Sequence, residues 1–276
     1  MVLPWAFDGG VECSLLRRAV SASFGFLMEK KVYLIGAGPG DPELLTLKAA
    51  RILTEADAVL YDNLISPSIL KLIPDTAEKI YVGKSKSNHT LKQEEINALL
   101  IELAGKYSKV IRLKGGDPFI FGRGGEEVEA LAAAEIGFEV VPGITAAQAC
   151  GALLGIPLTH RDFVSGVHFF TGHGCHDIEP GLDWDILASE DKTLCIYMGL
   201  TNISMICERL AEHGMDKNTD AVVVENGSLP NQRHVFCKLA ELPKKIEDGA
   251  FKSPALVIIG KVVGFARDLQ KPATQT

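Results

Sequence analysis

The stretch from Val110 to Glu127 constrains the fold of this chain more than any other segment. It begins with a β-branched run, which is typical of a buried strand, and it ends in two acidic residues that suit the first turn of a helix. Between these ends lie five glycines, two arginines, a lysine and an aspartate. Glycine lets the backbone approach a ligand closely, and open α/β sheets bind ligands at the carboxyl ends of their strands. The stretch therefore predicts an α/β sheet with a binding loop at a strand end.

Strand-like and helix-like segments alternate from Lys31 to Val141. Asp41 suits the cap of a helix whose apolar face runs from Leu45 to Ala56, because Pro42 and Glu43 favour its first turn. Such alternation implies a mostly parallel sheet with right-handed crossovers. We expect two further helices at 91–104 and 126–136, and strands at 32–35, 58–61, 80–82, 110–113 and 138–141.

The pattern changes after Thr145, which suits the cap of a short apolar helix that ends near Gly155. Later strand-like runs have longer and more polar connections, so we expect a mixed sheet in a second α/β domain. The expected strands are 167–171, 193–197, 221–224 and 256–259, with a loop over 174–190 and a helix over 200–213. The expected domains are 29–142 and 143–266, with an extension outside the fold at 1–28 and a tail at 267–276.

Composition excludes several classes of protein. The 276 residues carry a net charge of −7, which argues against a general binder of nucleic acid or of anionic membranes. The longest uncharged stretch, 140–159, is interrupted by proline and glycine, so no membrane span is expected. The six cysteines are scattered without a C-x-x-C pair, as is typical of free thiols in the reducing cytoplasm. His173, Cys175 and His176 do not match a zinc spacing, so no metal is expected.

The glycine turn from Gly36 to Asp41 follows the first expected strand. It differs from a dinucleotide fingerprint, which requires glycine where this chain has Asp41. Pro39 removes one amide donor from the turn, and Asp41 would repel a pyrophosphate. The turn therefore favours a ligand that carries positive charge or that needs a surface of carbonyl groups.

Two pairs of residues are candidates for chemistry. Asp62 and Lys84 follow neighbouring strands, where they suit a base and an acid, or form an ordinary surface salt bridge. Arg123 and Glu126 flank two glycines at a helix start. There Glu126 can fix the Arg123 guanidinium for carboxylate binding, or the two can serve only helix-end electrostatics. His160 and His173 are further candidates for pocket donors.

Eight motifs together carry a resemblance to a known family. The chain resembles the tetrapyrrole methylases, and within them the uroporphyrinogen-III C-methyltransferases. The motifs at 114–127 and 157–173 are specific, whereas the turn at 36–40 is shared by the whole superfamily. The likeness covers about 31–263, and its motifs are 32–46, 61–66, 114–127, 141–147, 157–161, 171–173, 197–199 and 225–227.

The resemblance implies two α/β domains with the active site in the cleft between them, where S-adenosylmethionine binds, and a homodimer. It implies two successive methylations of uroporphyrinogen III, at C-2 and C-7, which give precorrin-2 by way of precorrin-1. By matching motif positions, it also implies a set of cofactor-binding residues: Pro39, Gly115, Gly116, Asp117, Ile120, Thr145, Ala146, Met198 and Gly227.

The same resemblance assigns roles on the substrate side. Asp62 and Lys84 match positions proposed as acid and base, and Arg123 and Glu126 match positions that have been given catalytic roles. Arg161 and His173 match positions that line the substrate. One departure is Asn63, where some relatives carry an arginine that would contact a carboxylate.

An acidic protein must gather cations locally if it is to bind a substrate with eight carboxylates. The expected cations are Lys84, Arg112, Lys114, Arg123, Arg161 and His173. Asp117 and the carbonyl groups of 114–118 are expected to hold the sulfonium of the cofactor. Three alternatives remain open: a later corrin-ring methylase, a ribosomal-RNA methylase, and a non-catalytic tetrapyrrole carrier.

Overall fold

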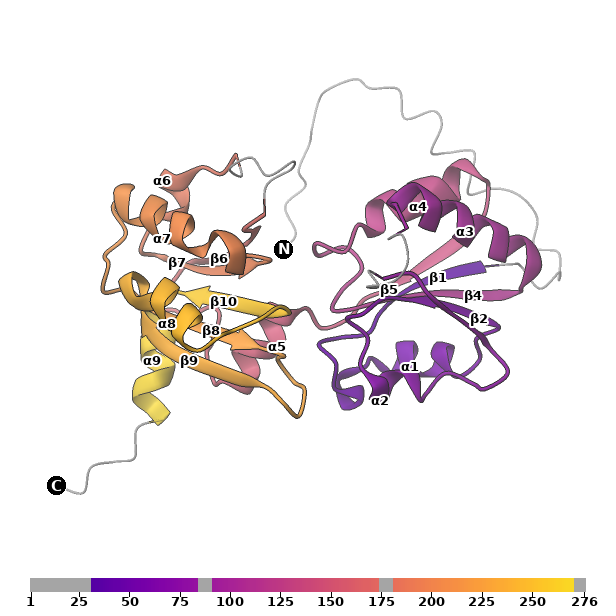
Figure 1. Cartoon of the computed structure of the whole chain (residues 1–276), viewed down its shortest axis with the longest axis horizontal. Coiled ribbons are helices and arrows are strands. Elements are labelled where there is room, and N and C mark those ends of the chain that lie inside the picture. The colour runs from indigo at the N-terminus through magenta and orange to yellow at the C-terminus, as the bar shows by residue number, and fades with distance from the viewer. Residues whose placement is uncertain (1–30, 84–90, 174–180, 271–276) are drawn as a thin grey trace, which may run out of the picture.

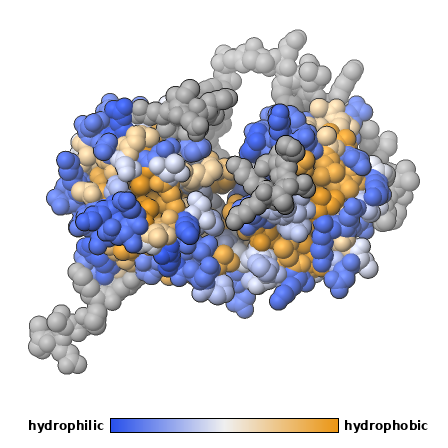
Figure 2. Space-filling model, in the orientation of Figure 1, coloured by the Kyte–Doolittle hydropathy of each residue, from blue (hydrophilic) through white to orange (hydrophobic). Residues whose placement is uncertain are grey.

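The computed structural model describes residues 31–83, 91–173 and 181–270. These residues form two α/β domains, each built on a five-stranded sheet with helices on both faces (Figure 1). On the face shown in Figure 2, hydrophilic residues cover much of the outside of both domains.

The sheet of the first domain is parallel throughout, in the strand order β3-β2-β4-β1-β5. The expected strands of this domain are all present, with ends that differ from the expected ones by at most two residues. Their observed bounds are β1 Lys31–Gly36, β2 Ala58–Tyr61, β3 Glu78–Tyr81, β4 Lys109–Lys114 and β5 Gly137–Val141.

Helices cover the two faces of this sheet in pairs (Figure 1). Helices α1 (Leu47–Leu53) and α2 (Pro67–Leu70) pack on the face that contains Ile35 and Leu113. Helices α3 (Gln93–Lys106) and α4 (Gly124–Ala133) pack on the opposite face, which contains Leu34 and Val110. Each fully buried aliphatic side chain contributes about 1.5–3 kcal/mol, so burial on both faces stabilises the sheet.

The first helix begins later than the sequence pattern predicted. The Asp41 carboxylate does cap a helix, but only the 3-10 helix η1 (Pro42–Leu44), where it accepts a hydrogen bond from the Glu43 amide. Leu45 is extended, and α1 starts afresh because Thr46 Oγ1 accepts from the Ala49 amide at 3.1 Å. The apolar pattern from Leu45 to Ala56 predicted one continuous helix, but the Thr46 cap starts a separate helix at Leu47.

The sheet of the second domain is mixed, as expected, in the order β6-β7-β10-β8-β9. Strands β6 and β7 are parallel and the other neighbours are antiparallel. The edge strand β9 was not expected, because its run from Arg233 to Lys238 mixes charged and apolar residues. The bounds are β6 Gly166–Thr171, β7 Lys192–Tyr197, β8 Asp220–Glu225, β9 Arg233–Lys238 and β10 Ala255–Ile259.

Five helices of the described part of the chain pack on the second sheet, and three of them were not expected from the sequence. Helix α6 (Trp184–Leu187) lies in the expected loop over 174–190, and α8 (Leu242–Asp248) was not anticipated. In the first domain, the short helix α2 was not anticipated either. Helix α9 (Lys261–Gln270) continues past the expected end of the domain at 266, and Arg267 forms an ion pair with Asp220. Helices α6, α7 (Ile203–Glu212) and α8 cover one face, while α5 (Ala146–Leu153) and α9 cover the other.

The domains meet where β5 leads into α5 (Figure 1). Strand β5 closes the first sheet, whereas Ala147 and Cys150 of α5 belong to the core of the second domain. The Asp41 amide of the first domain donates to Ser228 Oγ of the second at 3.1 Å. In the part of the chain that is described, no helix is long and apolar enough to cross a membrane.

Candidate active site

The ends of β1 and β4 form the topological switch point of the first domain. These strands are neighbours, but the chain leaves β1 toward the α1 face and leaves β4 toward the α4 face. Loops that diverge in this way open a binding position at the carboxyl ends of the strands. Here the two loops are tied by paired backbone hydrogen bonds, from Gly38 to Gly116 at 3.1 Å and from Gly116 to Gly38 at 2.7 Å.

Three glycines bring these loops together with the chain that leaves β5. A Cβ atom on Gly143 would lie 2.2 Å from the Gly116 carbonyl oxygen, and one on Gly36 would lie 2.5 Å from the Gly143 amide nitrogen. Gly116 and Gly38 also have positive φ angles, of 66° and 67°. The three segments therefore pack backbone against backbone, with no side chain between them. Their amide and carbonyl groups lie at the carboxyl ends of the strands.

Asp117 fastens this arrangement. One of its carboxylate oxygens accepts from the Phe119 amide at 2.9 Å, and the other accepts from the Gly143 amide at 3.1 Å. We expected the carboxylate to hold a cationic cofactor directly. Its two contacts instead join the loop after β4 to the segment after β5, so its observed contribution is to fix the backbone.

The loop from 117 to 124 has an unusual conformation. Phe121 and Arg123 have positive φ angles of 53° and 58°, which are uncommon for residues with a side chain and occur often at functional sites. Arg123 Nε donates to Glu126 Oε1 at 3.1 Å, and a second guanidinium nitrogen pairs with the other carboxylate oxygen. The expected Arg123–Glu126 contact is confirmed. Both side chains remain about half exposed, at 56% and 48%, and can meet a ligand.

Tyr197, at the end of β7, connects the two domains. Its hydroxyl group pairs with Thr145 Oγ1 at 2.7 Å and accepts from the Ala147 amide at 3.0 Å. Its ring lies 4.9 Å from that of Phe121, which belongs to the first domain. Thr145 therefore starts α5 as expected, but a tyrosine hydroxyl satisfies the helix amide in place of the threonine side chain.

Met198 follows Tyr197 and has a positive φ angle of 52°. Its side chain is 52% exposed, which is unusual for a large apolar residue that follows a buried strand. Asn226 and Ser228 also have positive φ angles, and they flank Gly227 in the loop after β8. A Cβ atom on Gly227 would lie 2.6 Å from Cys150 Sγ, so this glycine lets the loop pack on α5.

Tyr197 was not among the residues predicted for the site. The motif at 197–199 was noticed, but only Met198 was carried forward from it. The sequence did contain a signal for Tyr197, because it is a tyrosine at the end of an otherwise apolar strand. A tyrosine hydroxyl in such a position needs a hydrogen-bond partner, which indicates a contact with another segment.

Asp62 follows β2, the strand beside β4. One carboxylate oxygen accepts from the Leu64 amide at 3.0 Å, and the other lies 3.4 Å from Arg112 Nη2. Strands β2 and β3 are neighbours as expected. Lys84, the proposed partner of Asp62, lies outside the described residues.

Arg112 and Lys114 are not surface cations, which corrects our expectation that they receive substrate carboxylates. They lie on the inward face of β4 at 4% exposure, where the fully buried Glu127 of α4 forms ion pairs with both. Glu127 Oε1 accepts from Arg112 Nε at 3.0 Å and from Lys114 Nζ at 2.9 Å. A strand covered on both faces directs residues 110, 112 and 114 into the core, so a buried acid must accompany them.

The remaining predicted residues lie in exposed segments of the second domain. Arg161 is exposed between α5 and β6, and His173 follows β6, where its amide donates to Thr171 Oγ1 at 3.2 Å. The ring of His160 packs against Phe163 at 4.5 Å and Phe265 at 4.9 Å, and its Nδ1 accepts from the Asp162 amide at 3.2 Å. Within 31–83, 91–173 and 181–270, no cluster of three potential metal ligands occurs.

Comparison with known proteins identifies the family. A family model described as Tetrapyrrole (Corrin/Porphyrin) Methylases matches residues 31–243, which is well over half of the chain. The chain belongs to the tetrapyrrole methylases. The matched region contains both loops of the switch point and the end of β7.

Several relatives of this methylase are known in sequence. Siroheme synthase from Azotobacter vinelandii is 53% identical over 233 residues, which are 84% of this chain and 50% of that protein. Siroheme synthase from Acinetobacter baylyi is 52% identical over 240 residues, which are 87% of this chain and 52% of that protein. The methylase thus spans about half the length of these curated relatives.

Solved structures share its fold. Uroporphyrin-III C-methyl transferase from Thermus thermophilus, complexed with S-adenyl homocysteine, is 42% identical with a TM-score of 0.72. That match covers 84% of this chain and 93% of the other. A cobalt precorrin-4 methyltransferase from cobalamin biosynthesis is 25% identical, with a TM-score of 0.77 and coverage of 85% and 96%.

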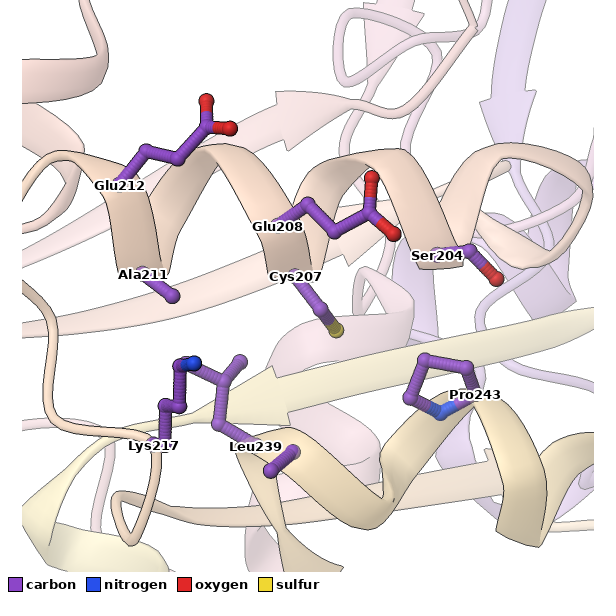
Figure 3. Close-up of a pocket in the computed structure, with 9 residues that line it drawn as sticks. Ser204, Cys207, Glu208, Ala211, Glu212, Lys217, Leu239 and Pro243 are labelled. Carbon is purple, nitrogen blue, oxygen red and sulfur yellow. The ribbon is translucent and has the colours of Figure 1, made fainter.

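A hollow of about 490 Å³ lies elsewhere on the methylase, between α7 and the segment that contains α8 (Figure 3). It has no glycine loop, and none of the predicted site residues lines it. Its size therefore does not make it the candidate site, which depends on the loops at the strand ends. Its lining residues, all in the described part of the chain, are Ser204, Cys207, Glu208, Ala211, Glu212, Lys217, Leu239, Ala240 and Pro243.

Replacing Tyr197 with phenylalanine is expected to loosen the domain junction. The change leaves the Ala147 amide and Thr145 hydroxyl of the methylase without their partner, which should cost about 1–3 kcal/mol of unfolding free energy. Denaturant unfolding would measure the loss. Tyr61→Phe is a matched control, because no hydrogen bond of the Tyr61 hydroxyl occurs within the described residues. Equal effects of the two changes would contradict the role given to Tyr197.

The buried lysine predicts a pH dependence of stability. Burial lowers the pKa of Lys114 below its usual 10.5, and the Arg112 charge adds to this effect while Glu127 opposes it. The unfolded chain therefore binds more protons between the folded and unfolded pKa values, so the contribution of Lys114 to unfolding free energy rises as pH approaches 10.5. Lys114→Met should remove this rise, whereas the surface change Lys71→Met should keep it. A Lys114→Met curve parallel to that of the unchanged methylase would refute the prediction.

Proposed function

We propose that this methylase transfers two methyl groups from S-adenosylmethionine to uroporphyrinogen III. The groups go to C-2 and C-7 in succession, which gives precorrin-1 and then precorrin-2. The observation that carries the proposal is the switch point of β1 and β4, where paired glycine loops present backbone groups and the loop after β4 reaches Tyr197 of the second domain through Phe121. The likeness to the Thermus thermophilus enzyme, whose structure holds S-adenyl homocysteine, supports this choice of cofactor.

The proposed cofactor site combines backbone groups with few charges. The loops at 36–40 and 115–117 supply carbonyl oxygens that suit a sulfonium cation, and Asp117 ties the loop after β4 to the segment after β5. Thr145, Ala146, Met198 and Gly227 form the side that belongs to the second domain. Pro39 and Ile120 complete the proposed set, which matches the family motifs position by position.

The chemistry needs no nucleophile from the protein. A pyrrole carbon of the substrate is electron-rich and attacks the methyl carbon in line, while the thioether leaves with the electron pair of the broken carbon–sulfur bond. Holding the two reactants in this alignment contributes roughly 7–11 kcal/mol to lowering the barrier. A base then removes a proton from the macrocycle.

We assign substrate carboxylate binding to Arg123, Arg161 and His173. Arginine is too firmly protonated to act as a base, so Arg123 binds a carboxylate in a geometry that Glu126 fixes. The proton acceptor is then Asp62 or Glu126, and Lys84 remains the proposed acid. Loss of turnover with unchanged substrate affinity in Arg123→Lys would contradict the assignment of Arg123.

The setting of the reaction remains a prediction. We expect a homodimer in the cytoplasm, whose product enters the synthesis of sirohaem, cobalamin or haem d1. The curated relatives are named siroheme synthase, which favours the synthesis of sirohaem as the pathway, but this chain spans only about half of their length. Sedimentation of the purified chain would test the homodimer.

Anaerobic incubation with S-adenosylmethionine and uroporphyrinogen III, followed by mass spectrometry, tests the proposal. Two added methyl groups are expected, and NMR of a product made with ¹³C-labelled cofactor would locate them. Binding of S-adenosylhomocysteine without methylation of uroporphyrinogen III would favour a different ring substrate, such as that of a later corrin-ring methylase. Tetrapyrrole binding without cofactor binding would indicate a carrier.

A further inference from the structure

We propose that Arg112 is a positioning residue that fixes the carboxylate of Asp62 for the reaction. This inference rests on the proposed function and takes Asp62, rather than Glu126, as the proton acceptor. Arg112 does not touch substrate in this proposal, because it is buried beneath the strand ends. It acts through Asp62, whose side chain is 21% exposed and follows β2 at the carboxyl edge of the sheet.

The guanidinium of Arg112 is held on two sides by the protein interior. Its Nε donates to Glu127 Oε1 at 3.0 Å, and its Nη1 donates to the Leu113 carbonyl at 3.0 Å. A guanidinium is planar, so two fixed nitrogens determine the direction of the third. The third nitrogen, Nη2, lies 3.4 Å from Asp62 Oδ2.

Other hydrogen bonds fix the carboxylate of Glu127 in the position where it pairs with Arg112. Its Oε1 accepts from Lys114 Nζ at 2.9 Å and from Gln93 Nε2 at 3.3 Å, in addition to Arg112. Its Oε2 is buried and has no hydrogen-bond partner among the described residues. One oxygen thus collects three donors from α3 and β4, which anchors the acid at the centre of the cluster.

The charges of the cluster extend to Asp62. Within the described residues, two buried cations, Arg112 and Lys114, share one fully buried carboxylate, that of Glu127. The carboxylate of Asp62 supplies the second negative charge. Because the Leu64 amide holds its other oxygen at 3.0 Å, Asp62 is oriented from both sides. If the Asp62 carboxylate served only to end β2, it would not need a buried arginine to fix its orientation.

A double-mutant cycle tests the inference. Arg112→Met, Asp62→Asn and the double variant are compared by kcat, by KM for uroporphyrinogen III and by S-adenosylhomocysteine affinity. We expect Arg112→Met to lower kcat roughly 10-fold or more in the unchanged chain and less than about twofold in the Asp62→Asn background. Cofactor affinity should stay within about twofold of that of the unchanged protein, since Arg112 acts through Asp62.

The outcomes separate this inference from the proposed function. Additive losses in kcat, or a loss confined to cofactor affinity, overturn the positioning role while leaving the methylase function intact. If the unchanged chain transfers no methyl group to uroporphyrinogen III, the proposed function fails, and this inference fails with it. If Arg112→Met does not fold, Arg112→Lys keeps the buried charge and takes its place in the cycle, with the same non-additivity expected.

Discussion

Replacing Gly143 with alanine is expected to weaken cofactor binding strongly while most of the fold survives. The added methyl carbon would lie 2.2 Å from the Gly116 carbonyl oxygen and 2.8 Å from Gly36, so the three loops must separate. Such overpacking costs about 1–3 kcal/mol. If that energy is lost from the cofactor-binding conformation, affinity falls by up to roughly 100-fold. Calorimetric titration with S-adenosylhomocysteine would measure the change.

A matched control separates this effect from the general effect of adding a methyl group. Gly105 lies in α3, and a Cβ atom there would meet nothing within 4 Å. Gly105→Ala should leave cofactor affinity unchanged and raise stability by about 0.8–1 kcal/mol, because alanine favours a helix. Undiminished cofactor affinity in Gly143→Ala would show that the glycine junction does not support the cofactor site.

Replacing Glu127 with glutamine is expected to have the largest effect on stability. The side chain is fully buried, and its carboxylate is the shared partner of two buried cations. Removal of one partner from a buried ion cluster costs about 3–5 kcal/mol. Because burial lowers the pKa of Lys114, the loss should be smaller at alkaline pH, where the lysine gives up its proton. Denaturant unfolding at neutral and alkaline pH would measure both effects.

Glu129 provides the control for this change, since it lies on the same helix but is exposed. Glu129→Gln should change the unfolding free energy by no more than about 0.5 kcal/mol at either pH. If Glu127→Gln were as mild as this control, the buried cluster would not be a major source of stability, and the support proposed for Arg112 would be weak.

Much of the fold could be predicted because its signals are local. Apolar runs bounded by glycine or polar residues identified the strands of the first sheet, and the βα alternation predicted their parallel arrangement. Strand β9 was missed because its charged residues lie at a sheet edge, where solvent meets them. Helix α1 was placed too early because the pattern of apolar residues did not show that Thr46 restarts the helix.

The candidate site was less predictable, because its parts meet only through the tertiary structure. The contact between Arg123 and Glu126 was foreseen from their spacing on one helix start. The contacts of Asp117 with Gly143 and of Tyr197 with Thr145 join segments that are far apart in sequence. The role of Arg112 was misjudged, although its position on a doubly covered strand already implied burial.

The most direct test of this account is a crystal structure of the chain with S-adenosylhomocysteine. We predict that the ligand lies against the glycine loops at the ends of β1 and β4, and that Met198 contacts it from the second domain. A ligand bound instead in the hollow between α7 and α8 (Figure 3), with the glycine loops empty, would contradict the account.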